Sequence, residues 1–316
     1  MPDLGELRSE DPRGTWPDEA RDFTPWLAAH LPALGGVLGI EIELVQVEKD
    51  VGDFSIDILA RDLGRDRLVV VENQLEVTDH NHLGQILTYA AGVEAGAVAW
   101  VCRDFRPEHR KAIDWLNRGF GGKVDFFGVV LEVLRIDQSR PAVNLRLVAA
   151  PAEWGRTAPG GSGELSDRQR AYVRFFQRLI DELRDRHGFT NARVAQPMSW
   201  YSFRSGVTGL HYNVAFNRGG RLATELYIDL GDADHNERVL TRLLAHRGRI
   251  EAELGESLSW EDLATRRACR VACYRKGSID DSQDELDEYH EWSVSHLLAF
   301  RRVLGPLLGA AAAEGE

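Results

Sequence analysis

Two patterns of hydrophobic and polar positions alternate along the first half of the chain. Some segments are apolar at every second residue or form short continuous apolar runs, which is typical of strands. Others are apolar at every third or fourth residue, which indicates helices. The expected order is helix, three strands, helix, strand, helix and two strands. These elements cover residues 24–38, 39–52, 54–62, 68–74, 78–93, 97–102, 107–119, 124–136 and 142–149.

This order predicts an α/β domain over residues 21–154, with a mixed sheet flanked by helices. A Gly-, Pro- and Ser-rich segment follows at 155–167 and is predicted to be a linker. We expect residues 1–20 to form a disordered tail and residues 310–316 a second one.

The second half of the chain predicts an α+β domain over residues 168–309. A helix is followed by three strands, a helix, a strand and a last helix. These elements cover residues 168–188, 199–204, 210–217, 221–230, 236–255, 267–275 and 284–308.

Composition and charge exclude several classes of protein. No apolar run reaches the roughly 18–20 residues that a membrane-spanning helix needs. The polar, acidic first residues do not resemble a secretory signal, and three cysteines are too few for a disulfide framework, so we expect a cytoplasmic protein. The net charge is −12, whereas proteins that bind duplex DNA of any sequence usually present a basic surface. A role in nucleic-acid chemistry must therefore rest on a local site.

Two carboxylates in neighbouring predicted strands are the strongest candidates for such a site. Asp57 lies in the second strand, and Glu72 and Gln74 lie on one face of the third. If the two strands are neighbours, Asp57 and Glu72 can meet, and two close carboxylates repel unless a proton or a cation neutralises them. Mg²⁺ or Mn²⁺ bound there could generate a hydroxide and stabilise charge on a phosphodiester.

The helix after these strands adds polar groups. Gln85 and Tyr89 are four residues apart and lie one above the other, and His82 shares roughly that side. A Gln amide and a Tyr hydroxyl that face a sheet edge are suited to hold a phosphate or a base.

These residues carry a resemblance. The strand with Asp57, the strand with Glu72-Asn73-Gln74 and the helix with Gln85-x-x-x-Tyr89 resemble the PD-(D/E)xK nuclease superfamily, and the last element is similar to that of its RecB-like members. The resemblance implies a restriction-endonuclease-like fold over residues 24–136. It implies metal-dependent hydrolysis of nucleic acid, with DNA favoured over RNA, and a role in defence against foreign DNA.

The resemblance also implies roles for single residues. Asp57, Glu72 and the backbone carbonyl of Asn73 would bind the metal ion. Gln74 would position the attacking water, and Gln85 and Tyr89, with His82 on the same side of the helix, would bind the substrate.

Two departures from the superfamily pattern lead to an alternative. Gln74 stands where a lysine is usual, and the helix at 25–38 lacks the glutamate that many members place on their first helix. A neutral amide can orient water but exchanges no proton. The alternative is therefore a nuclease fold without catalysis that binds nucleic acid or protein.

The second domain offers weaker signals. The whole chain resembles bacterial proteins of unknown function that combine such a nuclease-like half with segments like Trp200-Tyr201-Ser202-Phe203 and Tyr289-x-x-Trp292. We interpret these aromatic residues as core. The second domain is also a candidate to contact a second copy or a partner protein, and to gate the first domain.

Four other groups of residues could bind ligands, but simpler interpretations are favoured. Cys269 and Cys273 lack a second ligand pair and are interpreted as buried thiols, and His80 and His82 lack further ligands at a zinc-like spacing. The acidic run at 280–288 is interpreted as the start of a helix. A face bearing Arg266, Arg270, Tyr274 and Lys276 could bind a nucleic-acid strand or simply contact solvent.

Overall fold

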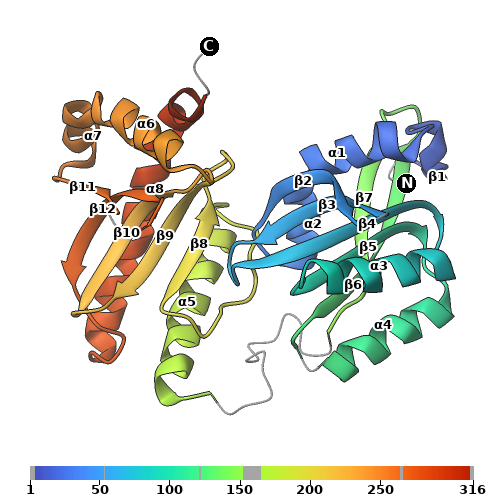
Figure 1. Ribbon diagram of the computed structural model, residues 1–316, viewed down its shortest axis with the longest axis horizontal. Coiled ribbons are helices and arrows are strands. Elements are labelled where there is room, and N and C mark those ends of the chain that lie inside the picture. The colour runs from blue at the N-terminus through green and yellow to red at the C-terminus, as the bar shows by residue number, and fades with distance from the viewer. Residues whose placement is uncertain (1–3, 53, 121, 152–164, 264–265, 314–316) are drawn as a thin grey trace. The chain divides into compact units, whose positions relative to one another are not determined.

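The chain forms two compact units, residues 1–164 and 165–316, each with its own sheet and hydrophobic core (Figure 1). The computed structural model describes residues 4–52, 54–120, 122–151, 165–263 and 266–313. The predicted linker at 155–167 lies outside the described residues except for its last three, and the last three residues of the predicted C-terminal tail lie outside them too. Among the helices of the described residues, none is both long and apolar enough to cross a membrane.

The first unit is built on a mixed, seven-stranded sheet. Its order is β1-β6-β5-β4-β3-β2, with β7 also paired to β6. The pairs β4·β5 and β5·β6 are parallel, and the other pairs are antiparallel. The strands are β1 (Leu7–Glu10), β2 (Ile42–Val51), β3 (Phe54–Asp62), β4 (Arg67–Val77), β5 (Ala97–Asp104), β6 (Asp125–Ile136) and β7 (Ala142–Ala149).

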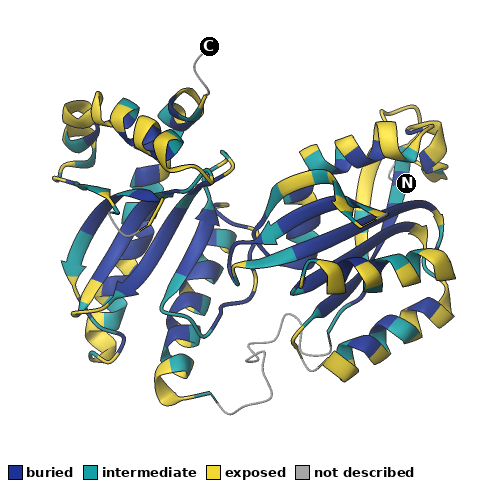
Figure 2. Cartoon of the chain, viewed as in Figure 1, coloured by how far each residue is buried: buried dark blue, intermediate teal, exposed yellow. Residues whose placement is uncertain are grey.

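Helices cover both faces of this sheet. On one face, α1 (Thr24–Ala29) and α2 (Leu31–Leu38) pack leucines against alternate residues of β3, β4 and β5. On the other, α3 (His80–Gly92) and α4 (Pro107–Phe120) pack against the intervening residues. Because both faces are covered, the central strands are buried almost throughout, which explains their continuous apolar runs (Figure 2).

The N-terminal part of this unit differs from the prediction in two ways. The predicted helix at 24–38 is two helices that meet at His30, because Pro32 lacks the N–H group that would continue the first helix. The predicted tail at 1–20 is wrong in part, since β1 pairs with β6 and a short π-helix, η2 (Glu19–Phe23), precedes α1. The pairing of β1 with β6 depends on residues far apart in the chain, which local patterns do not reveal.

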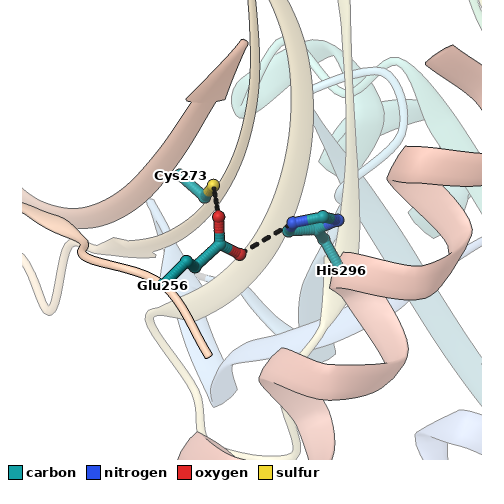
Figure 3. Close-up of side chains that lie close together, drawn as sticks. All are labelled: Glu256, Cys273 and His296. Carbon is teal, nitrogen blue, oxygen red and sulfur yellow. Dashed lines mark hydrogen bonds and ion pairs between the residues drawn. The ribbon is translucent and has the colours of Figure 1, made fainter. Parts of the chain in front are cut away.

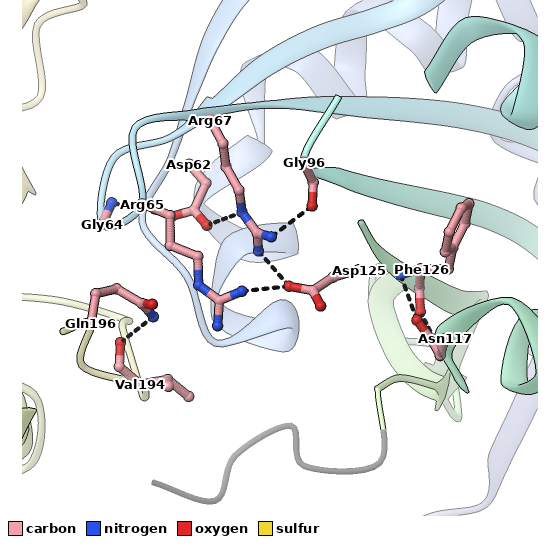
Figure 4. Close-up of polar contacts among 10 residues, drawn as sticks. All are labelled: Asp62, Gly64, Arg65, Arg67, Gly96, Asn117, Asp125, Phe126, Val194 and Gln196. Carbon is pink, nitrogen blue, oxygen red and sulfur yellow. Dashed lines mark hydrogen bonds and ion pairs between the residues drawn. The ribbon is translucent and has the colours of Figure 1, made fainter. Parts of the chain in front are cut away.

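Buried ion pairs hold the turn between β3 and β4. The Arg67 guanidinium contacts Asp62 at 3.0 Å and Asp125 at 2.7 Å, and it donates to the Gly96 carbonyl (Figure 4). Arg65 also contacts Asp125, at 2.5 Å. These contacts tie the β3–β4 turn to the starts of β5 and β6 and so fix the register of β3 on β4.

The second unit has a five-stranded antiparallel sheet in the order β11-β12-β10-β9-β8. The helices pack on it around one core. The strands are β8 (Trp200–Arg204), β9 (Leu210–Asn217), β10 (Arg221–Ile228), β11 (Ser259–Asp262) and β12 (Cys269–Lys276). The helices are α5 (Asp167–Asp185), α6 (Ala233–Leu244), α7 (Arg247–Leu254) and α8 (Gln283–Ala312). The prediction missed β11 and joined α6 and α7 into one helix.

The predicted acidic helix start is confirmed at α8. Ser282 is its N-cap and forms a capping box with Glu285, and Asp284 and Glu285 lie in the first turn. We expect Ser282→Ala to lower the free energy of unfolding by about 1 kcal/mol, because the Glu285 backbone N–H loses its acceptor. Thermal unfolding would measure this. Ser295→Ala, at an exposed position within α8, is the control, and an equal loss in both variants would contradict the capping argument.

Candidate functional site

Asp57 and Glu72 lie at the point where β3 leaves β4. The two strands pair from Asp62↔Arg67 to Ile58↔Val71, so Asp57 and Glu72 are the next facing positions. Beyond them the Asn73 backbone N–H donates to Asp57 Oδ2 at 2.8 Å. Carboxylates thus replace the neighbouring strand as acceptors for the backbone of β4.

A third carboxylate reaches the same edge of β4. Glu19, in η2, accepts the backbone N–H of Leu75 at 2.5 Å. The position of η2 is fixed by Thr24, whose hydroxyl donates to the Glu19 carbonyl and accepts from the Asn73 side chain. The helix predicted at 24–38 contains no glutamate, as expected, but the preceding η2 brings Glu19 to this edge. Glu19 was missed because it lies in a segment predicted to be a tail, before the first apolar helical pattern.

Asp57 and Glu72 at this edge of β4 have raised pKa values, because they are buried close to one another. Burial, followed by the charges of neighbouring acids, raises the pKa of Glu72 to about 9. Burial also raises the pKa of Asp57 to about 7, although the bond from Asn73 opposes the shift. Neither side chain forms an ion pair with a lysine or arginine of the described residues. Bound protons or a cation would therefore stabilise Asp57 and Glu72 at this edge.

Buried oxygens without partners lie on the same elements. Glu72 Oε2, Gln74 Oε1 and Gln85 Oε1 are buried, and none has a hydrogen-bond partner in the described part of the chain. The Gln74 amide nitrogen donates to the Val77 carbonyl and to Asp79 Oδ2, which fixes its oxygen as the free end. Buried polar atoms are usually paired, so these oxygens are suited to an ion, a water molecule or a substrate.

The helix α3 brings the predicted substrate residues over this face. Tyr89 is buried, and its pKa is raised by burial and then by the charges of Glu72 and Asp57, while a hydrogen bond with Gln85 opposes the shift. The ring of His82 lies 3.0 Å from Asp79, the N-cap of α3, and the charge of His82 lowers the pKa of Asp57. The fold thus brings these side chains within electrostatic reach of the carboxylates.

The other sequence candidates are occupied by ordinary contacts. His80 Nδ1 lies 3.0 Å from Nε2 of His109, a residue that the sequence did not single out. In the second unit, Tyr201 and Tyr289 are buried in the core, as predicted. Arg270 and Tyr274 both contact Glu261, so these two members of the basic face are already paired.

Comparisons with known proteins found a family of unknown function and a distantly similar solved structure. The family described as "Domain of unknown function (DUF4268)" matches residues 171–308, within the second unit. No curated protein matches the chain. Among solved structures, a repair endonuclease from Pyrococcus abyssi matches with a TM-score of 0.28 and 14% identity, over 31% of this chain and 43% of that chain. The match spans less than half of that endonuclease, and its TM-score is too low to assign an activity.

Proposed function

We propose that the first unit is a metal-dependent nuclease with a restriction-endonuclease-like fold, which hydrolyses phosphodiesters in nucleic acid, DNA more readily than RNA. The observation that carries the proposal is the meeting of Glu19, Asp57 and Glu72 at one edge of β4, where none of the three forms an ion pair with a lysine or arginine among the described residues. A fold does not bury uncompensated acids side by side without a reason, because their repulsion destabilises it.

The residues present fit a hard divalent cation. Asp57 and Glu72 offer carboxylate oxygens, and Glu72 Oε2 lacks a partner among the described residues. In a strand the N–H and C=O of one residue point to the same side, so the Asn73 carbonyl should face Asp57 as its N–H does. Mg²⁺ and Mn²⁺ prefer such oxygen ligands. When bound, the ion would lower the pKa of a water molecule and neutralise charge on the phosphate.

The side chains around this centre would orient the reactants. Gln74 Oε1 can accept a hydrogen bond from the attacking water, but a neutral amide cannot take its proton. Glu19 is the carboxylate available for that proton, since Leu75 occupies only one of its oxygens. Gln85 and Tyr89 would hold the phosphate or a base, and His82 would contact the substrate through Nε2 because Asp79 engages Nδ1.

A cleavage assay tests this proposal. Supercoiled plasmid, linear duplex, single-stranded DNA and RNA are each incubated with Mg²⁺, Mn²⁺ or EDTA, using the wild type and the Asp57→Ala/Glu72→Ala variant. We expect cleavage that requires metal and is lost in the variant. Absence of cleavage together with binding that persists in EDTA would contradict the proposal and favour the alternative, a binding module on an inactive nuclease fold.

Glu19→Gln is expected to weaken Mn²⁺ binding about tenfold. The glutamine oxygen can still accept the Leu75 N–H, so the fold is kept, but the third negative charge beside the ion is lost. Mn²⁺ titration followed by electron paramagnetic resonance measures the affinity. Glu76→Gln, on β4 next to Leu75 but in an exposed pair with Arg13, is the control. Equal affinities of the Glu19→Gln variant and the wild type would remove Glu19 from the site.

A further inference from the structure

Three side chains with metal-binding atoms meet in the second unit. Glu256 follows α7, Cys273 lies on β12 and His296 lies on α8 (Figure 3). One carboxylate oxygen, the sulfur and one imidazole nitrogen all lie within 4.8 Å of one another. The fold therefore brings together a sulfur, a nitrogen and an oxygen donor from three separate elements.

Glu256 is the centre of this group. The Cys273 thiol donates to Glu256 Oε2 at 2.8 Å. His296 Nε2 lies 2.7 Å from the other carboxylate oxygen, Oε1. A proton on Cys273 and a proton between His296 and Glu256 thus hold the three side chains together.

The imidazole of His296 is already oriented for an ion at Nε2. Its Nδ1 lies 2.7 Å from the Trp292 carbonyl oxygen, which can only accept, so Nδ1 carries a proton. The ring also packs on the Trp292 side chain, with centroids 4.2 Å apart. A backbone carbonyl that fixes the tautomer of a histidine in this way is a usual feature of metal sites.

We propose that Glu256, Cys273 and His296 bind a divalent ion of the zinc class. Thiolate and imidazole ligands select Zn²⁺ or Co²⁺ over Mg²⁺, and three protein ligands leave a fourth position for water or another ligand. Binding releases the thiol proton, because the thiolate is the form of cysteine that binds a metal ion.

Only a small movement is needed to admit the ion. Bond lengths of about 2.0–2.3 Å place the atoms of a tetrahedral site about 3.3–3.7 Å apart. The contacts to Glu256 at 2.7 and 2.8 Å must therefore open by about 1 Å or less, and ligand atoms up to 4.8 Å apart must close by at most about 1.5 Å. Glu256 follows Gly255, which ends α7 in the left-handed conformation, and its side chain is 33% exposed. This side chain can move without disturbing the core.

The chain also supplies a matched control for this site. Cys269 lies on the same strand, four residues before Cys273, and it is buried in the same core. It is not a member of the group around Glu256. The prediction that both cysteines are buried and free of disulfides is confirmed, but only Cys273 has ligand partners.

Cobalt absorption tests the proposal on the full chain. The Asp57→Ala background removes two ligand oxygens of the proposed nuclease centre, which contains no sulfur, so a thiolate-to-cobalt charge-transfer band reports the second unit alone. We expect one Co²⁺ per chain with this band and with the intense visible bands of a tetrahedral ion. Zn²⁺ should abolish both. Cys273→Ser should remove the charge-transfer band, whereas Cys269→Ser should retain it.

The other two ligands decide between an ion site and a hydrogen-bonded triad. Glu256→Gln and His296→Gln should each weaken Co²⁺ binding at least tenfold. If Cys273→Ser fails to fold, the Glu256→Gln variant still tests the proposal, because Glu256 is partly exposed. An unchanged affinity of Glu256→Gln for Co²⁺ would overturn the proposal. A wild-type protein with reduced thiols that shows no charge-transfer band would overturn it as well. Either result leaves the nuclease proposal untouched.

Discussion

Asp57→Asn is expected to lower metal-dependent cleavage by at least about 10³-fold, which corresponds to roughly 4 kcal/mol in activation free energy. The asparagine has the shape of the aspartate, and its side-chain oxygen can still accept the Asn73 N–H. What it lacks is the negative charge that would hold the cation beside Glu72. A loss of cleavage in this variant would therefore result from the missing negative charge and not from a change in side-chain shape.

The measurement is the single-turnover cleavage rate at saturating Mn²⁺, on the substrate that the wild type cleaves best. Asp50→Asn is the control, because Asp50 is an exposed carboxylate on β2 and its loss changes the net charge by the same amount. Both variants should retain the circular dichroism spectrum of the wild type. Cleavage by Asp57→Asn at the rate of the control would show that Asp57 does not bind the catalytic ion.

The second large effect is on stability, and it has the opposite sign from a usual core substitution. Glu72→Gln is expected to raise the free energy of unfolding of the metal-free protein by at least about 2 kcal/mol at pH 8, because each unit of pKa shift is worth about 1.4 kcal/mol. For a unit of this size the melting temperature should rise by about 4–8 °C. The glutamine keeps the volume of the side chain and removes an acid that burial disfavours in its charged form.

The sign of the pH dependence follows from the raised pKa. Between pH 4.5, the ordinary value for a glutamic acid, and about 9, the folded protein holds a proton on Glu72 that the unfolded chain has lost. The free energy of unfolding of the wild type should therefore fall as pH rises through this window. Asp57 adds to the fall between its ordinary value of 3.8 and about 7.

Urea unfolding in EDTA between pH 5 and pH 9 measures this effect. The wild type should lose stability across the range, and Glu72→Gln should lose less. Mn²⁺ should restore the wild type most strongly at high pH, because the ion replaces the protons. Parallel pH profiles for the two proteins, with no response to Mn²⁺, would contradict the idea that these acids repel one another in the folded state.

Local sequence patterns were sufficient to predict the central strands and the faces on which their residues lie. The strand at 54–62 was predicted with the bounds of β3, because its apolar and polar residues alternate along the chain. Alternation along β4 then placed Glu72 and Gln74 on one face, and helical spacing placed Gln85 and Tyr89 together on α3.

The sequence by itself thus determined the type and order of most elements and which residues share a face, because these follow from interactions between near neighbours in the chain. Only the tertiary structure decided which separate segments meet. Glu19 reaches β4 because Thr24 and Asn73 bond across 49 residues, and Glu256, Cys273 and His296 meet because α8 and α7 pack beside the second sheet. Such contacts depend on sheet register and helix packing, which no local spacing encodes.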